Sequence, residues 1–220
     1  MRYLLLLTFF VPLLCSGYDI GGVNLKLLSP DSSLEEACLD KNTYDYVSKS
    51  TDAQSSLITC YANTQEWSEG NGTIVHKVEI IKEYQNKTFD ELKFEKEVNK
   101  LYDAIRKYNN FALKNSGKLT DSQINMIDSI KKSSDINVDF EVKNTLMTEI
   151  DSSKNHVILS NSNSIIFNGK TMKTRTLICF MNVKGKMITL RSINTKQEQN
   201  SSNHQLATLK KWIAAIKDAN

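Results

Sequence analysis

The sequence is poor in the residue types that catalytic and metal-binding sites most often need. It has 220 residues with three histidines, four cysteines and two prolines, and His76, His156 and His204 stand far apart. A zinc site needs Cys, His or carboxylate ligands at close, repeated spacing, so we expect no metal and no cofactor. The Gly-x-Ser-x-Gly motif that carries the nucleophilic serine of α/β-hydrolases is also missing.

Charge of one sign is not concentrated in this sequence either. Lysine and arginine number 28 against 25 aspartate and glutamate residues, which gives a formal net charge of +3. A nucleic-acid-binding protein needs a basic stripe on one face, so we expect no nucleic-acid partner. Hydrophobic residues make up 40% of the chain, which predicts a packed core rather than intrinsic disorder.

One long apolar run is present, and it lies at the N-terminus. A single arginine precedes the run from Leu4 to Leu14, and small residues follow it. This order is typical of a secretory signal peptide, so we expect residues 1–17 to be removed and the protein to be periplasmic or extracellular. The run is too short for a transmembrane anchor, which needs about 20 residues. A lipoprotein carrying lipid on Cys15 is the alternative, but the leucine before Cys15 is larger than a lipidation signal prefers.

Cysteines are too few for a scaffold held by several disulfides. After removal of the predicted signal peptide, Cys38, Cys60 and Cys179 remain, and three thiols allow one internal disulfide at most. We expect Cys38–Cys60, because the loop between them is short and both lie in the N-terminal half. A Cys60–Cys179 disulfide is the alternative if their strands pair, and three reduced, buried cysteines are another.

Hydrophobic periodicity predicts an α+β fold with a mostly antiparallel sheet. Two helices within about 88–133 form a predicted central pair, each opened by a capping box, and a helix beginning at Ser202 closes the chain on the sheet. A capping box at Ser33 predicts a further short helix through Cys38. No Gly-, Ser- or Pro-rich linker interrupts residues 18–220, so we expect one domain. The predicted strands are 23–27, 57–62, 73–81, 136–142, 156–159, 164–167, 174–183 and 187–193.

The segment Lys184-Gly185-Lys186 lies between two of these strands. A phosphate-binding loop needs several glycines and a helix directly after them, and neither is present. We therefore predict a hairpin turn with Gly185 at positive φ. We expect Lys184 and Lys186 of this turn, and Trp67 in a polar loop, to lie at the surface, where they could contact a partner.

The lack of a convergent catalytic set favours a non-catalytic binding or accessory module with a protein or envelope partner. The alternative is an exported cysteine-dependent hydrolase, in which Cys179 would be activated by His76 or His156, since all three lie in predicted strands. A buried, structural Cys179 is the simpler interpretation. A secreted effector is a further alternative.

Four further segments are distinctive: Gly-Val-Asn-Leu-Lys-Leu at 22–27, residues 57–62 followed by Glu66-Trp67 and Gly70, Val-Lys-Gly-Lys at 183–186, and Trp212-Ile213 with Ala219-Asn220. In these segments the chain resembles a group of small, exported, uncharacterised bacterial proteins, and this resemblance implies export without implying an activity. The order of strands and helices is also similar to Mog1/PsbP-like domains, which serve as binding or assembly modules; that similarity concerns the fold alone.

Overall fold

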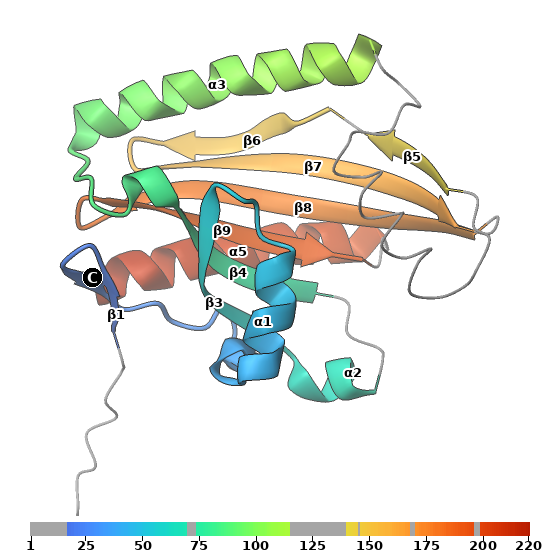
Figure 1. The fold of residues 1–220 in the computed structure, drawn as a ribbon, viewed down its shortest axis with the longest axis horizontal. Coiled ribbons are helices and arrows are strands. Elements are labelled where there is room, and N and C mark those ends of the chain that lie inside the picture. Colours follow the sequence, from blue (N-terminus) through green and yellow to red (C-terminus); the bar gives the residue numbers. More distant parts are fainter. Residues whose placement is uncertain (1–16, 70–73, 115–139, 145, 168–169, 196–198) are drawn as a thin grey trace, which may run out of the picture.

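The predicted α+β class is confirmed by the fold, which is an antiparallel sheet between two long helices (Figure 1). No helix in the part of the chain that the structure covers is both long and apolar enough to cross a membrane. The second helix of the predicted central pair and nearly all of the predicted signal peptide lie outside the described residues. The computed structural model describes residues 17–69, 74–114, 140–144, 146–167, 170–195 and 199–220.

Within the described residues, the main sheet has seven strands in the order β3-β4-β9-β8-β7-β5, and β6 pairs with β7 beside β5. All neighbours pair antiparallel. A separate two-stranded hairpin is formed by β1 (Tyr18–Ile20) and β2 (Val23–Leu25). The strands of the main sheet are β3 (Ser55–Ala62), β4 (Ile74–Ile81), β5 (Phe140–Asn144), β6 (Thr148–Ser153), β7 (His156–Phe167), β8 (Lys170–Val183) and β9 (Lys186–Asn194).

Short helices flank β3, and the two long helices cover the faces of the sheet (Figure 1). The helices are η1 (Ala37–Leu39), α1 (Lys41–Lys49), α2 (Thr64–Ser68), η2 (Lys82–Tyr84), α3 (Glu91–Lys114) and α5 (Gln199–Ala219). The predicted closing helix is therefore confirmed and begins slightly earlier than Ser202.

Helix α5 buries its apolar stripe on one face of the sheet. Leu209, Trp212 and Ile216 recur at helical spacing and have no exposed surface. They pack in one cluster with alternate residues of the central strands, among them Val78 and Leu190. The Trp212 indole Nε1–H donates to the Leu28 carbonyl at 2.6 Å, which ties the segment after β2 to α5.

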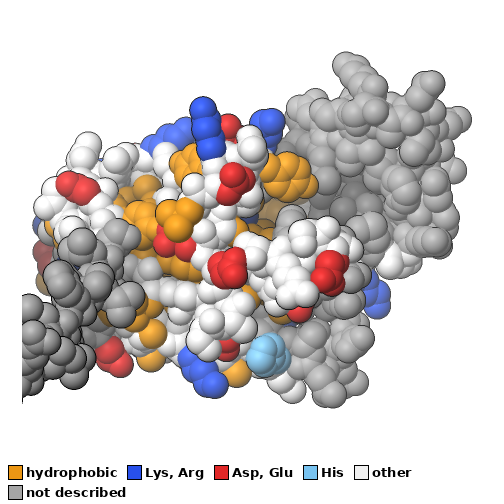
Figure 2. Space-filling model, turned by 90° about the horizontal axis from the view of Figure 1, so that it is seen from below, with side chains coloured by type: hydrophobic (Ala, Val, Ile, Leu, Met, Phe, Trp, Pro, Cys, Tyr) orange, Lys and Arg blue, Asp and Glu red, His pale blue; other side chains and the backbone are white. Residues whose placement is uncertain are grey.

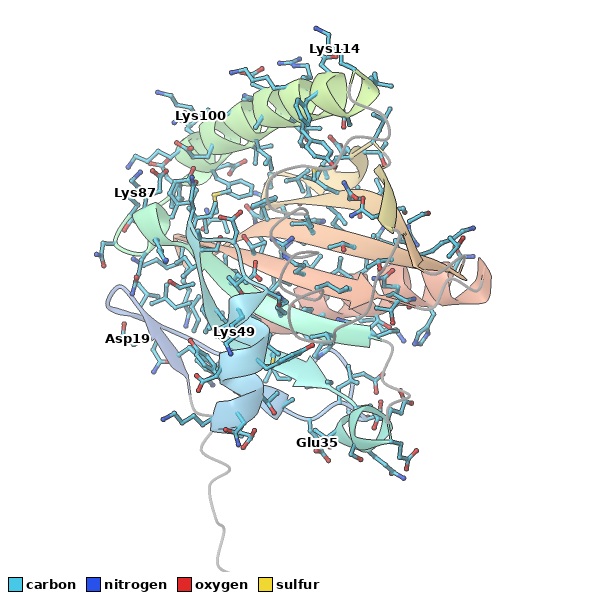
Figure 3. The ribbon with its side chains drawn as sticks, turned by 45° about the vertical axis from the view of Figure 1, so that its right-hand side comes forward. Asp19, Glu35, Lys49, Lys87, Lys100 and Lys114 are labelled. Carbon is cyan, nitrogen blue, oxygen red and sulfur yellow. A yellow bond between two sulfur atoms is a disulfide. The ribbon has the colours of Figure 1, made fainter. Side chains whose placement is uncertain are left out.

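Helix α3 covers the opposite face. Its partly buried Val98, Leu101 and Ile105 pack against a cluster that includes Val157 and Ile178. Figure 3 shows lysines such as Lys87, Lys100 and Lys114 pointing away from the sheet along this edge of the molecule. The charged residues of α3 thus form a solvated outer side.

Two predicted capping boxes are wrong in their details. The Asp90 carboxylate accepts the Lys93 N–H at the start of α3, so Asp90 caps the helix in place of Thr88. Ser33 donates its hydroxyl to Asp31 and caps no helix; the short helix predicted through Cys38 is present as the 3₁₀ helix η1, which has no side-chain cap. The first α-helix instead begins after Asp40, whose carboxylate accepts the N–H of Thr43.

Other elements also differ from the sequence prediction. The strand predicted at 23–27 is the second arm of the β1–β2 hairpin, which turns at Gly21 and Gly22, both at positive φ. A Cβ on Gly21 would lie 2.1 Å from the Gln85 carbonyl oxygen, so this turn approaches the chain after η2 too closely for a side chain. The strands predicted at 156–159 and 164–167 form one long strand, β7.

The predicted disulfide Cys38–Cys60 is confirmed, and it joins η1 to the edge strand β3. Its two Cα atoms lie 5.1 Å apart, within the normal range for a disulfide. The segment around η1 otherwise has a small hydrophobic cluster of Val47, Leu57 and Cys60. The disulfide is therefore the main covalent constraint on this edge of the sheet.

Loss of this disulfide is expected to destabilise the fold by about 3 kcal/mol, because it closes a loop of 22 residues. The test is urea unfolding of the wild type and of the double variant Cys38→Ser/Cys60→Ser, each with and without a reductant. The wild type should lose stability on reduction to the level of the variant, and the variant should not respond. Equal unfolding midpoints for the oxidised and reduced wild type would show that the disulfide contributes nothing.

Candidate functional site

Cys179, the candidate nucleophile from the sequence, lies inside the core. Cys179 pairs with Leu190 and Ile158 on its neighbouring strands and has no exposed surface. Burial raises the pKa of its thiol well above the usual range, which disfavours the reactive thiolate. His76 is not brought beside it, because β9 separates β4 from β8. The thiol in this position is closed to a substrate.

The second candidate base, His156, belongs to a polar cluster at the end of the β6–β7 hairpin. Its Nδ1 lies 2.7 Å from the Ser153 hydroxyl and 3.1 Å from the Lys217 ammonium. Asp151 lies 3.9 Å from Nε2 and pairs with Lys210 at 2.8 Å. Burial, and then Lys217, lower the pKa of the imidazole. These contacts join β6 and β7 to α5, so the cluster fastens the helix to the sheet.

The turn between β8 and β9 has the predicted hairpin form. Lys184 and Gly185 have φ of 47° and 77°, the positive values of a two-residue hairpin turn, and Lys184 is exposed as expected. The expectation of an exposed Lys186 is wrong, because its side chain is 2% exposed and its ammonium donates to the carbonyls of Gln85 and Lys87, each at 3.2 Å. Trp67 lies on the short helix α2 instead of a loop.

A buried charge cluster lies on the α1 side of the sheet. Glu79 is 1% exposed, and its carboxylate lies 3.5 Å from the Lys77 ammonium and 3.1 Å from the Arg191 guanidinium. Lys77 also donates to the backbone oxygen and hydroxyl of Ser50 at the end of α1. Burial lowers the pKa of Lys77, and the carboxylate of Glu79 opposes this effect. Because these groups satisfy one another, the cluster is a structural connection between α1 and the sheet.

A polar pocket of about 320 Å³ lies between the loop after Pro30, α2, the start of β4 and the first turns of α5. The structure gives it buried polar groups at its base and carboxylates at its rim. We call it the polar pocket; its polar residues include Asp31, Asn63, Glu66, His76, His204 and Gln205.

His76 forms one wall of the polar pocket. Alternation along β4 places it on the same face as Val78 and Ile80, so its ring turns toward α5. The ring packs edge-to-face on Trp212 with centroids 5.6 Å apart, and only 2% of the residue is exposed. Its Nδ1 is buried without a hydrogen-bond partner. Burial lowers the pKa of His76 to about 4, so the ring is neutral at pH 7.

Gln205 lies beside it on α5 and is fully buried. Its amide Nε2 donates to the Ser192 backbone oxygen at 2.9 Å, to the Ser192 hydroxyl at 3.2 Å and to the Arg175 backbone oxygen at 3.3 Å. These acceptors fix the orientation of the amide, because only the nitrogen end can donate. The oxygen Oε1 is left buried with no partner. An unpaired buried acceptor costs about 1–3 kcal/mol, so this oxygen is a candidate contact for a bound molecule.

Acidic residues stand at the rim of the polar pocket. Asp31 accepts the backbone N–H and the hydroxyl of Ser33, and these bonds are the largest cause of its lowered pKa. Glu66 lies in the first turn of α2, where its N–H donates to the side chain of Asn63. Glu35, which is outside the lining of the pocket, lies next to α2 (Figure 3), where its carboxylate accepts the Thr64 hydroxyl.

The buried neutral state of His76 makes stability depend on pH. The unfolded chain takes up a proton on this imidazole near pH 6.5, whereas the folded chain does so only near pH 4. The contribution of His76 to the free energy of unfolding is therefore fully present above pH 6.5. It declines by about 3 kcal/mol as the pH falls to 4. Urea unfolding from pH 7.5 to 4 should show this decline in the wild type and a flatter profile in His76→Gln. Parallel profiles for the two proteins would contradict the assignment.

A second hollow, of about 430 Å³, lies between α1 and β3 beside the disulfide. Figure 2 shows the lower face of the molecule, where hydrophobic side chains are exposed between acidic ones. The lining of this hollow includes Tyr46, Val47, Ala62 and Val75, and Tyr46 is 67% exposed. None of the described residues in this lining has a buried side-chain nitrogen or oxygen without a partner, so the hollow lacks the unpaired groups of the polar pocket.

Comparison with other proteins adds no further residue to the site. The chain matches no protein-family model, no curated protein and no solved structure. The likeness of residues 22–27 and 183–186 to small exported bacterial proteins therefore stays a prediction. Among the residues that the structure describes, no three His, Cys, Asp or Glu side chains lie together as metal ligands would.

Proposed function

We propose that the protein is an exported, non-catalytic binding module whose ligand site is the polar pocket. The observation that carries this proposal is a pair of buried polar atoms, His76 Nδ1 and Gln205 Oε1, for which the described residues provide no hydrogen-bond partner. Buried polar atoms are nearly always paired in folded proteins, and two exceptions in one pocket are typical of a site for a bound molecule.

Two features support export. The apolar N-terminal run has the order of a signal peptide. The Cys38–Cys60 disulfide is a bond that forms and persists in oxidising compartments. The partner in this proposal is a small polar molecule of the extracellular or periplasmic space, or the same chemical group carried by an envelope component.

The test is NMR mapping of the backbone and imidazole signals while small cationic, neutral and anionic organic molecules are added. Binding in the polar pocket should shift the signals of His76, Gln205 and Thr208, and Gln205→Leu should weaken it. Asn155→Ala, at the distant β6–β7 turn, is the control and should leave binding unchanged. A panel that moves none of these signals, or moves them equally in Gln205→Leu, would refute the proposal.

A further inference from the structure

The chemistry of the polar pocket favours one class of ligand. The amide of Gln205 can present only its oxygen, because its nitrogen is fully committed to Ser192 and Arg175. The neutral ring of His76 carries one N–H and one lone-pair nitrogen. We assign the proton of this ring to Nε2, and the buried Nδ1 is then a second acceptor. Both buried groups then need a ligand that donates hydrogen bonds.

The charges at the rim point the same way. Asp31 and Glu66 are exposed carboxylates in the lining, and none of the described lining residues is a lysine or arginine. Asp31 also interacts electrostatically with His204, which is in the lining, and with Lys211, which lies outside it. The Ser33 hydroxyl donates its hydrogen to Asp31, so it does not compete with a ligand as a donor to the other groups of the pocket. A cation entering this pocket meets two carboxylates, His204 and the two buried polar groups of His76 and Gln205.

We infer that the ligand of the polar pocket is a small organic ammonium ion, an inference that rests on the proposed binding function. A primary ammonium group has three N–H donors. Two of them match His76 Nδ1 and Gln205 Oε1, and the third matches a carboxylate of the rim, Glu66 or Asp31. The volume of about 320 Å³ lies at the lower end of the range for small-molecule sites, which suits a compact amine.

Three probes of similar size and different charge test this inference: ethanolamine, ethylene glycol and glycolate. Each is titrated into the full-length mature protein at pH 7, and the signals of His76 and Thr208 are followed by NMR. Ethanolamine should bind, and the other two should bind at least tenfold more weakly. Removal of the rim charge in Glu66→Gln should weaken ethanolamine binding about tenfold, as expected for one charge-assisted hydrogen bond. Asp31→Asn should act in the same direction.

The matched control is Glu69→Gln, which removes the same charge close to α2 but outside the lining of the pocket. Its ethanolamine affinity should equal that of the wild type. Binding of ethylene glycol or glycolate as tight as that of ethanolamine would overturn the inference and leave the proposed binding function standing. Equal losses of ethanolamine affinity in Glu66→Gln and Glu69→Gln would also overturn the inference. The preference for a cation would then come from the overall negative charge of this surface and not from a specific contact. A pocket that binds none of the probes and holds only water would overturn both.

Discussion

Replacement of Glu79 by alanine is expected to destabilise the fold by about 3–5 kcal/mol. The carboxylate is 1% exposed, and it faces both the Lys77 ammonium and the Arg191 guanidinium. Without it, Lys77 stays buried with only the oxygen atoms of Ser50 as partners. An uncompensated buried charge is among the most costly defects in a protein interior. The measurement is urea unfolding at pH 7 followed by circular dichroism.

A double variant separates the destabilisation caused by an unpaired buried charge from the net contribution of the ion pair to stability. Lys77→Met/Glu79→Leu removes both buried charges and keeps similar volumes, so it should be far more stable than Glu79→Ala and close to the wild type. Arg191 is 26% exposed and can turn to water when its partner is lost. If the double variant is as unstable as Glu79→Ala, the cluster stabilises the fold through its attraction and not merely by mutual compensation.

Replacement of Trp212 by alanine is expected to cost a similar amount, about 3–5 kcal/mol. The side chain is fully buried, packs edge-to-face on Tyr61 and His76, and donates to the Leu28 carbonyl. Its loss opens a cavity between α5 and the sheet. Because the substitution removes one of the two tryptophans, circular dichroism is the better probe of unfolding.

Trp212→Phe is the matched control for the same site. This variant keeps an aromatic ring but loses the hydrogen bond to the Leu28 carbonyl. Its free energy of unfolding should fall clearly less than that of the alanine variant. Part of the fall is the roughly 1–3 kcal/mol that an unpaired buried acceptor costs. A loss below about 1 kcal/mol for Trp212→Ala would contradict the central packing role of this residue.

Periodicity and short spacings predicted much of the fold. The alternation at 73–81 predicted β4, because its hydrophobic positions repeat every two residues as in a strand. The apolar stripe after Asp90 predicted α3, because its hydrophobic positions repeat with the helical period. The short separation of Cys38 and Cys60 gave the disulfide. Helix α1 was missed because it has nine residues and is mostly polar, so its apolar positions are too few to show a helical period.

The candidate site could be predicted only in part, because distant segments form it. His76 has the strand position of a residue that faces the core, but its pocket neighbour Gln205 comes from the last helix. Lys186 was expected at the surface because lysines usually lie there; its burial depends on carbonyls about 100 residues earlier in the chain, at Gln85 and Lys87. Local sequence patterns carry no information on such pairs.

The central claim is that His76 is a buried, neutral ring whose Nδ1 is an unpartnered acceptor in the polar pocket. The most direct measurement is the imidazole ¹⁵N NMR spectrum of the labelled protein from pH 7.5 to 5, with and without ethanolamine. The account predicts a proton fixed on Nε2 across this range and a shift of the Nδ1 signal when ethanolamine binds. A ring that titrates near pH 6.5, or a proton on Nδ1, would contradict it.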